Sequence, residues 1–134
     1  MTIQSLCKHI LDGGELYLAP VSEHYPALLI DRAPVPYRFQ VSKHGQLRVR
    51  STSVLSFGPA PVDWGHFHFF TVFDHPTCPL PIIFDTMAMV NPKPIVKGGY
   101  VAFQAEQFGL VTDLRKLGLA TGMREGRSRF QIDS

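Results

Sequence analysis

The chain has 134 residues, of which 45% are apolar and 18% charged, and its formal net charge is +2. This composition fits one folded domain, residues 1–134, and excludes a disordered chain. The small net charge does not by itself indicate nucleic-acid binding. No apolar run is long enough to cross a bilayer, so we expect no membrane association.

The cysteines and the first residues predict a cytoplasmic protein. The N-terminal segment lacks a basic region followed by a long apolar core, so we expect no signal peptide. Cys7 and Cys78 are far apart in the chain and have no CxxC spacing, which is typical of free thiols in a reducing compartment. In an exported protein the two could instead form one disulfide.

The first predicted element is a short helix over residues 3–11. Apolar residues recur there with the spacing of one helix face, at Ile3, Leu6, Cys7, Ile10 and Leu11. Thr2 can cap its start and the following Asp12-Gly13-Gly14 can end it. A strand is the alternative for this segment. Residues 15–19 and 27–31 are then predicted to be short strands, with prolines bracketing the connection.

A β-hairpin over residues 37–50 is the clearest local prediction. Apolar and polar residues alternate on both sides of the sequence Lys43-His44-Gly45. A two-residue turn would mix the two faces, whereas a three-residue loop pairs Val41 with Leu47 and keeps them separate. The loop requires a left-handed residue, and Gly45 supplies it. The outward face of this hairpin then carries Arg38, Arg48 and Arg50.

The middle of the chain, residues 51–90, contains no lysine or arginine and many aromatic residues. We expect it to form the structural centre, with the cationic parts at the periphery. Residues 65–74 are apolar on both alternating faces, which predicts a central strand buried between two layers. A further strand is expected at 81–85.

The last third of the chain gives weaker patterns. Residues 99–108 alternate enough to predict a strand, and leucines at helical spacing predict a short helix near 112–118. We expect residues 122–134, which are basic and glycine-rich, to be a loose tail. Together the elements predict an α+β, mostly β fold: a bent antiparallel sheet, barrel-like or sandwich-like, with one or two short helices.

A metal site is one hypothesis for the stretch WGHFHFFTVFDHP. On a strand, His66 and His68 project to the same side and could bind one divalent metal ion, with Asp74 or His75 as a further ligand. The His-x-His pattern resembles the first motif of the cupin barrels, but the acid and the later histidine of that pattern are missing. The alternative is that both histidines pack among aromatic side chains. Cys78 and His75 could form a nucleophile and its base, but a turn between two strands explains this proline-rich segment without catalysis.

The arginine-bearing face of the hairpin is the second hypothesis. Arg38, Arg48 and Arg50 could bind an acidic protein surface or phosphate groups, or could be an ordinary solvated face. We find no common catalytic or nucleotide-binding motif. We therefore expect a non-enzymatic accessory protein that binds a macromolecular partner, a protein more than a nucleic acid, through this face or a sheet edge. A small metal-dependent enzyme built on the His-x-His pair is the alternative.

Overall fold

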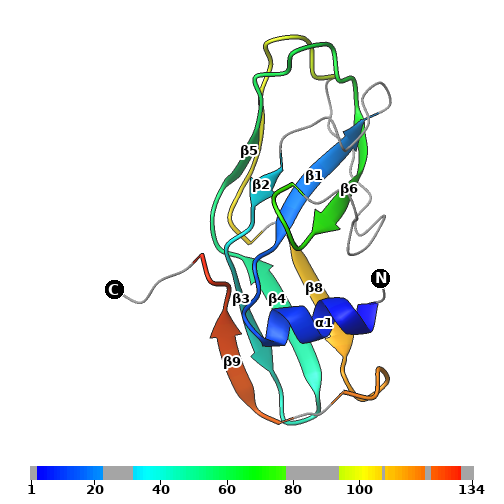
Figure 1. Ribbon diagram of the computed structural model, residues 1–134, viewed down its shortest axis with the longest axis vertical. Coiled ribbons are helices and arrows are strands. Elements are labelled where there is room, and N and C mark those ends of the chain that lie inside the picture. Colours follow the sequence, from blue (N-terminus) through cyan, green and yellow to red (C-terminus); the bar gives the residue numbers. More distant parts are fainter. Residues whose placement is uncertain (1–2, 23–31, 78–93, 107, 120–121, 131–134) are drawn as a thin grey trace.

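The computed structural model describes residues 3–22, 32–77, 94–106, 108–119 and 122–130. The elements are α1 (Ile3–Leu11), β1 (Tyr17–Ser22), β2 (Ala33–Pro34), β3 (Tyr37–Val41), β4 (Gln46–Ser51), β5 (Leu55–Phe57), β6 (Phe67–Phe73), β7 (Val101–Phe103), β8 (Gly109–Asp113) and β9 (Arg124–Arg127). Figure 1 shows their arrangement. The predicted strands at 27–31 and 81–85, and Cys78, lie outside the described residues.

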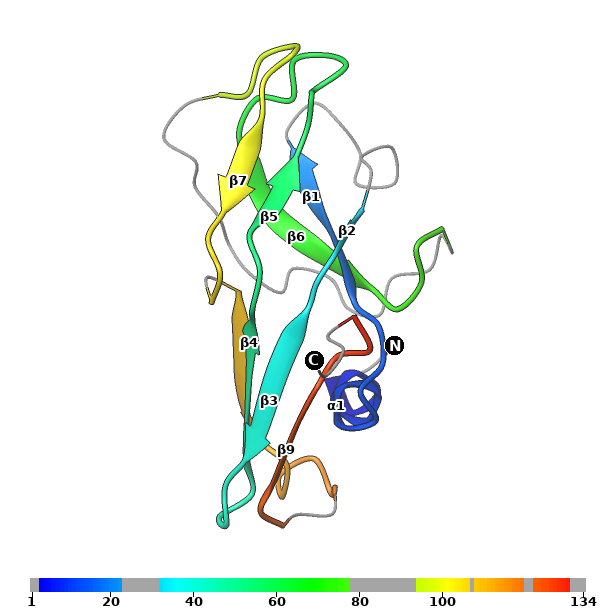
Figure 2. The same ribbon diagram turned by 90° about the vertical axis from the view of Figure 1, so that its left-hand side faces the viewer.

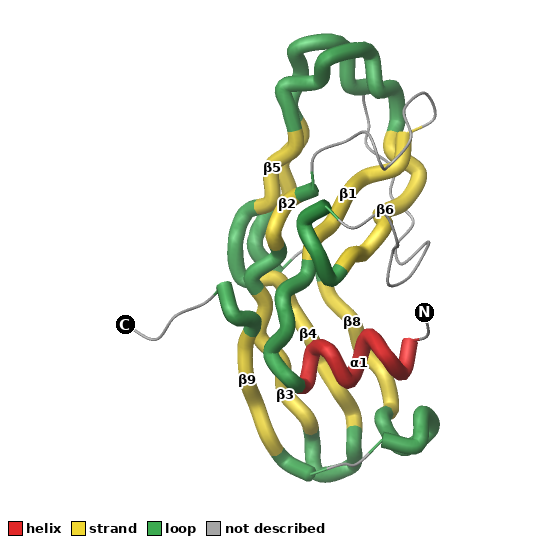
Figure 3. The backbone as a smooth tube through the Cα atoms, viewed as in Figure 1, coloured by secondary structure: helices red, strands yellow, loops and turns green. Residues whose placement is uncertain are grey.

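Within the described residues the strands form three antiparallel sheets. One has four strands in the order β8-β4-β3-β9, one has three in the order β2-β1-β6, and β5 pairs with β7. The four-stranded sheet lies at one end of an elongated molecule (Figure 3). The paired strands β5 and β7 lie toward the other end (Figure 2). The predicted mostly β, α+β fold is confirmed.

Helix α1 has the predicted bounds, so the alternative strand is excluded. Its apolar side buries Leu6, Cys7 and Ile10. The helix ends where the Gly13 N–H donates to the Ile10 carbonyl and the Gly14 N–H donates to the His9 carbonyl. Gly13 has a φ of +73° there, the left-handed conformation that commonly ends helices.

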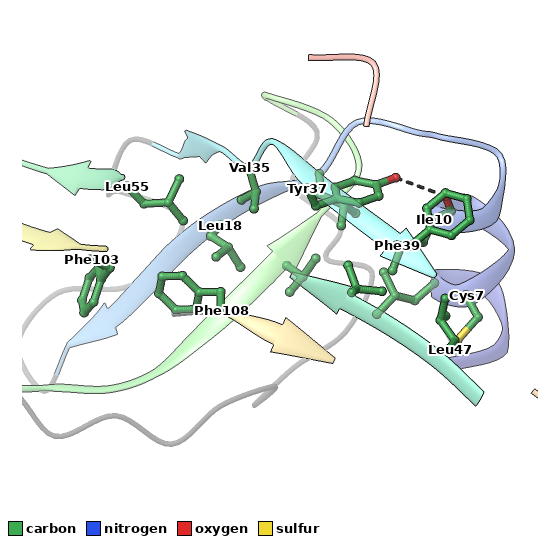
Figure 4. Packing of buried hydrophobic residues seen from close by; sticks show 14 of the residues in the cluster. Cys7, Ile10, Leu18, Val35, Tyr37, Phe39, Leu47, Leu55, Phe103 and Phe108 are labelled. Atoms are coloured by element: carbon green, nitrogen blue, oxygen red, sulfur yellow. Dashed lines mark hydrogen bonds between the residues drawn. The ribbon is translucent and has the colours of Figure 1, made fainter. Parts of the chain in front are cut away.

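The main core lies between α1 and the inner face of the four-stranded sheet. Figure 4 shows Cys7 and Ile10 facing Tyr37, Phe39 and Leu47. Every second residue of β3 and β4 is buried and the residues between them are exposed. Because α1 covers one side of this sheet, the opposite side stays open to solvent (Figure 2).

The β3–β4 hairpin has the predicted register. Val41 pairs with Leu47, Phe39 with Val49 and Arg38 with Arg50. Gly45 has a φ of +85°, and its N–H donates to the Ser42 carbonyl to close the loop. The three-residue loop predicted from clean separation of the two faces is therefore confirmed.

The predicted helix at 112–118 is wrong. Residues Gly109–Asp113 form β8, which pairs with β4, and residues 114–118 form a turn. Leu114 is fully buried, and its N–H donates to the Gly45 carbonyl. The leucine spacing does not distinguish a helix from a strand, because residues four apart, such as Leu110 and Leu114, share a face in both. Pairing with β4 makes this segment a strand.

The position of β6 also differs from the prediction. Among the described strands β6 lies at the edge of its sheet, and β1 is the central strand because it pairs with both β2 and β6. The predicted burial of both faces does hold at the end of β6, where Val72 joins the main core and Phe73 packs with Tyr17 and Ala19. The predicted strand at 99–108 is shorter, ending at Phe103.

Candidate functional site

Arginines gather on the open side of the four-stranded sheet. Arg38 on β3 and Arg48 and Arg50 on β4 are all exposed, because each alternates with a residue that is buried beneath α1. The structure therefore brings together the three arginines that the hairpin pattern placed on one face. Their spacing and their neighbours on the sheet determine what they can bind.

The arginines form a row that the sequence pattern did not reveal in full. Arg38 lies directly opposite Arg50 on one side and directly opposite Arg127 of β9 on the other. Opposed residues on antiparallel strands are about 4.5–5.5 Å apart at Cβ, so the Cβ atoms of the three arginines span about 10 Å across the sheet. Like charges in this arrangement repel each other and destabilise a sheet.

We call the outer side of β9, β3 and β4 the arginine face. Next to the arginine row is a mixed row, in which Gln40 lies between Glu125 of β9 and Arg48 of β4. The Arg48 Nε donates to the Gln46 Oε1 at 3.1 Å, which holds this side chain along the strand. Val111 of β8, 61% exposed, lies opposite Arg48 and extends the row with an apolar contact.

The arginine face is hollowed. One groove of about 680 Å³ is lined by Arg38, Gln40, Arg48, Arg50, Thr52, Ala105 and Glu106. A second hollow of about 460 Å³ lies on the other side of Arg38, toward β9, and includes Glu125 and Arg127. Arg38 borders both, so the two recesses meet at the middle of the arginine row.

Arg127 joins the arginines of the hairpin on this face, a placement that the pattern along the chain did not predict. The segment 122–134 was expected to be a loose tail, but Arg124–Arg127 form β9 and pair with β3. The strand is also fixed beyond its end, where the Ser128 Oγ accepts a hydrogen bond from the Tyr37 N–H at 3.1 Å. The signal that could have found it is the alternation of small Gly126 and Ser128 with charged Glu125 and Arg127.

Arg124 lies on the opposite side of β9 from Arg127. Its register partner is Val41, which is buried, whereas Arg127 is opposite exposed Arg38. Arg124 lines a hollow together with α1 residues, including Lys8. Arg124 also lines a hollow that reaches Gln40 and Arg48, so of the two arginines of β9 only Arg127 lies in the arginine row.

The residues of the metal hypothesis lie at different places along β6. His66 precedes this strand and Asp74 and His75 follow it, so about 26 Å of extended chain separates His66 from Asp74. His68 lies at a shift in the pairing register with β1. Ligands of one metal ion lie within a few ångströms of one another, and the structure does not bring His66 together with Asp74 or His75. The described residues contain no group of three His, Cys, Asp or Glu side chains suited to hold a metal ion.

His75 has local partners instead. Its Nδ1 accepts a hydrogen bond from the Thr77 N–H at 3.1 Å, and its carbonyl accepts one from the Arg32 Nη1 at 2.6 Å. Arg32 also lies over the ring of Phe73, 3.4 Å from its centroid. These contacts close the end of β6, where the sequence pattern predicted a turn.

No family model, curated protein or solved structure matches this chain. None of the helical structure in the described part of the chain has the length and apolar character needed to cross a bilayer. The function is therefore argued from the arginine face itself.

Proposed function

We propose that this chain is a non-enzymatic accessory protein that binds an acidic protein partner through the arginine face. The observation that supports this is the exposed pair Arg38 and Arg50, which lie directly opposite each other in the row. A like-charge row lowers the stability of the sheet that holds it. Carboxylates bound across the row would relieve that repulsion, and the planar guanidinium group binds carboxylates bidentately.

The composition of the face favours an extended acidic segment of a protein over a nucleic acid. Single-stranded nucleic acids are bound by exposed aromatic side chains on which bases stack. On the described strands of this sheet the aromatic residues, Tyr37 and Phe39, point into the core. Glu106 and Glu125 border the two recesses, where they would repel a continuous chain of phosphates, whereas a peptide can place a neutral or basic residue beside each glutamate. Val111 and Met123, 61% and 77% exposed, add the apolar contacts typical of protein interfaces.

The proposal places the protein in the cytoplasm. Cys7 is a free and fully buried cysteine, as expected of a protein in a reducing compartment.

Binding of a fluorescein-labelled acidic peptide, measured by anisotropy at low salt, tests the proposal. The test variant is Arg38→Glu combined with Arg50→Glu, and the matched control is Lys8→Glu combined with Lys116→Glu, which reverses two exposed charges outside both recesses. We expect the test variant to lose affinity by about tenfold or more, since charge-assisted hydrogen bonds contribute about 1.5–3 kcal/mol each. The control should bind as the wild type does.

Two outcomes would contradict the proposal. Equal losses in the test and control variants would mean that the peptide is held by net charge and not by the arginine face. Tighter binding of a single-stranded oligonucleotide of the same net charge would mean that the partner is a nucleic acid.

A further inference from the structure

Glu106 is held at the border of the arginine groove. It lines the groove together with Arg38, Arg48 and Arg50. The Glu106 N–H donates to the carbonyl of Ser51, the last residue of β4, at 2.6 Å. Two further hydrogen bonds join Ser51 to Phe108, one from the Ser51 N–H to the Phe108 carbonyl and one from the Phe108 N–H to the Ser51 Oγ. The loop is therefore anchored beside Arg50 at Glu106 and again at Phe108.

The backbone at Glu106 is unusual. Among the described residues it is the one non-glycine residue with a positive φ, +68°. This left-handed conformation is unfavourable for a residue with a Cβ atom and is normally taken by glycine or asparagine. A glutamate at this position presents a carboxylate at the groove at the expense of backbone strain, and residues held in such conformations cluster at binding sites.

We propose that Glu106 determines the specificity of the arginine groove, an inference that rests on the proposed function. A ligand must place acidic side chains against the arginine row and a cationic side chain, lysine or arginine, against Glu106. A uniformly acidic segment meets repulsion at Glu106, because like charges that face each other across an interface are unfavourable. The preferred ligand is thus an extended peptide in which a basic residue lies beside a pair of acidic residues. Specificity then arises from an unfavourable contact as well as from favourable ones.

Two labelled peptides of equal length test this inference by anisotropy at low salt. One is uniformly acidic and alternates glutamate with glycine, and in the other the terminal glutamate is replaced by lysine. We expect the wild type to bind the mixed peptide more tightly. Glu106→Gln should tighten binding of the acidic peptide and weaken binding of the mixed peptide, each by about two- to fivefold, as for a partly screened charge pair.

The control is Glu125→Gln, which removes the same charge from the same face but from the second hollow. It should leave the preference between the two peptides unchanged. Glu106→Gly, which suits the left-handed backbone, gives a second variant in which the loop conformation is retained. The inference is overturned if Glu106→Gln and Glu106→Gly change both affinities by the same factor. Absence of binding of either peptide to the wild type would overturn the proposed function itself.

Discussion

The ring of Phe39 on β3 lies directly against Gly126 on β9. The two residues are register partners, and a Cβ atom added to Gly126 would come within 2.5 Å of the Phe39 Cζ. Phe39 is buried, so its ring has little room to move. The absence of a side chain at Gly126 therefore allows β9 to pair with β3 and to place Arg127 in the arginine row.

Gly126→Ala should destabilise the protein by about 1–3 kcal/mol, because the added methyl group overpacks against the Phe39 ring. Urea denaturation measures this free energy of unfolding. Arg124→Ala, an exposed change on the same strand, serves as the control and should have little effect. In the Gly126→Ala background, Phe39→Leu should restore part of the loss, and strictly additive effects of the two substitutions would contradict the contact.

Relief of repulsion in the arginine row should be measurable as increased stability. Arg38→Thr removes the central charge of the row, and we expect the free energy of unfolding to rise by about 0.5–1 kcal/mol at low salt. The gain should fall in 1 M salt, where the Debye length is about 3 Å. Arg48→Thr is the matched control because Arg48 lies opposite Gln40 and not opposite an arginine. The same gain in both variants would show that repulsion within the arginine row does not destabilise the protein.

Alkaline pH should destabilise the fold through Tyr37. Burial raises the pKa of Tyr37 well above its ordinary value, and the Tyr37 hydroxyl donates to the Gly14 carbonyl at 2.7 Å. The unfolded chain therefore loses this proton near pH 10, whereas the folded protein retains it. The stabilisation is complete below pH 10 and is lost as the pH rises above that value, because the unfolded state then binds fewer protons.

Urea denaturation at pH 8 and at pH 11 tests this dependence. Tyr37→Phe should be less stable at pH 8 by about 1–3 kcal/mol, because the Gly14 carbonyl loses its buried donor. It should also show a smaller decrease between the two pH values than the wild type does. Burial also raises the pKa of Tyr17, so part of the decrease should remain in the variant. If the free energy of unfolding of Tyr37→Phe decreases between pH 8 and pH 11 as much as that of the wild type, Tyr37 does not contribute to the pH dependence.

Cys7 should resist alkylation in the folded protein. Its side chain is fully buried under the sheet, and burial raises the pKa of its thiol, so both access and the reactive thiolate form are limited. Iodoacetamide treatment at pH 8 followed by peptide mapping should find Cys7 unmodified in the native protein and fully modified in denaturant. Rapid modification under native conditions would mean that α1 detaches easily from the sheet.

Local patterns were sufficient for the elements whose structure depends on neighbouring residues. Apolar residues at helical spacing and the glycines after them predicted α1 with its correct bounds. In the β3–β4 hairpin, alternation together with Gly45 determined the register, since a slip by one residue would have exposed Val41 and Leu47. The shared face of Arg38, Arg48 and Arg50 followed from that register alone.

The remaining elements depended on pairing between segments far apart in the chain. Leu110 and Leu114 share a face on a helix and on a strand alike, and contact with β4 selects the strand. Residues 124–127 have a composition typical of a tail, yet they form β9 because Gly126 accommodates the ring of Phe39. Similarly, nothing in the local sequence indicates that Glu106 borders the groove, because a hydrogen bond from its N–H to the carbonyl of Ser51, at the end of β4, places it there.

The sequence by itself thus determined the mostly β class, the helix, the hairpin and the face on which three arginines lie. Only the tertiary structure decided that a fourth arginine completes a row and that a glutamate borders it. The physical reason is that periodicity and turn chemistry act between near neighbours, whereas strand order is set by packing against distant residues. Arg127 and Arg38 are far apart in sequence and become neighbours only when β9 pairs with β3.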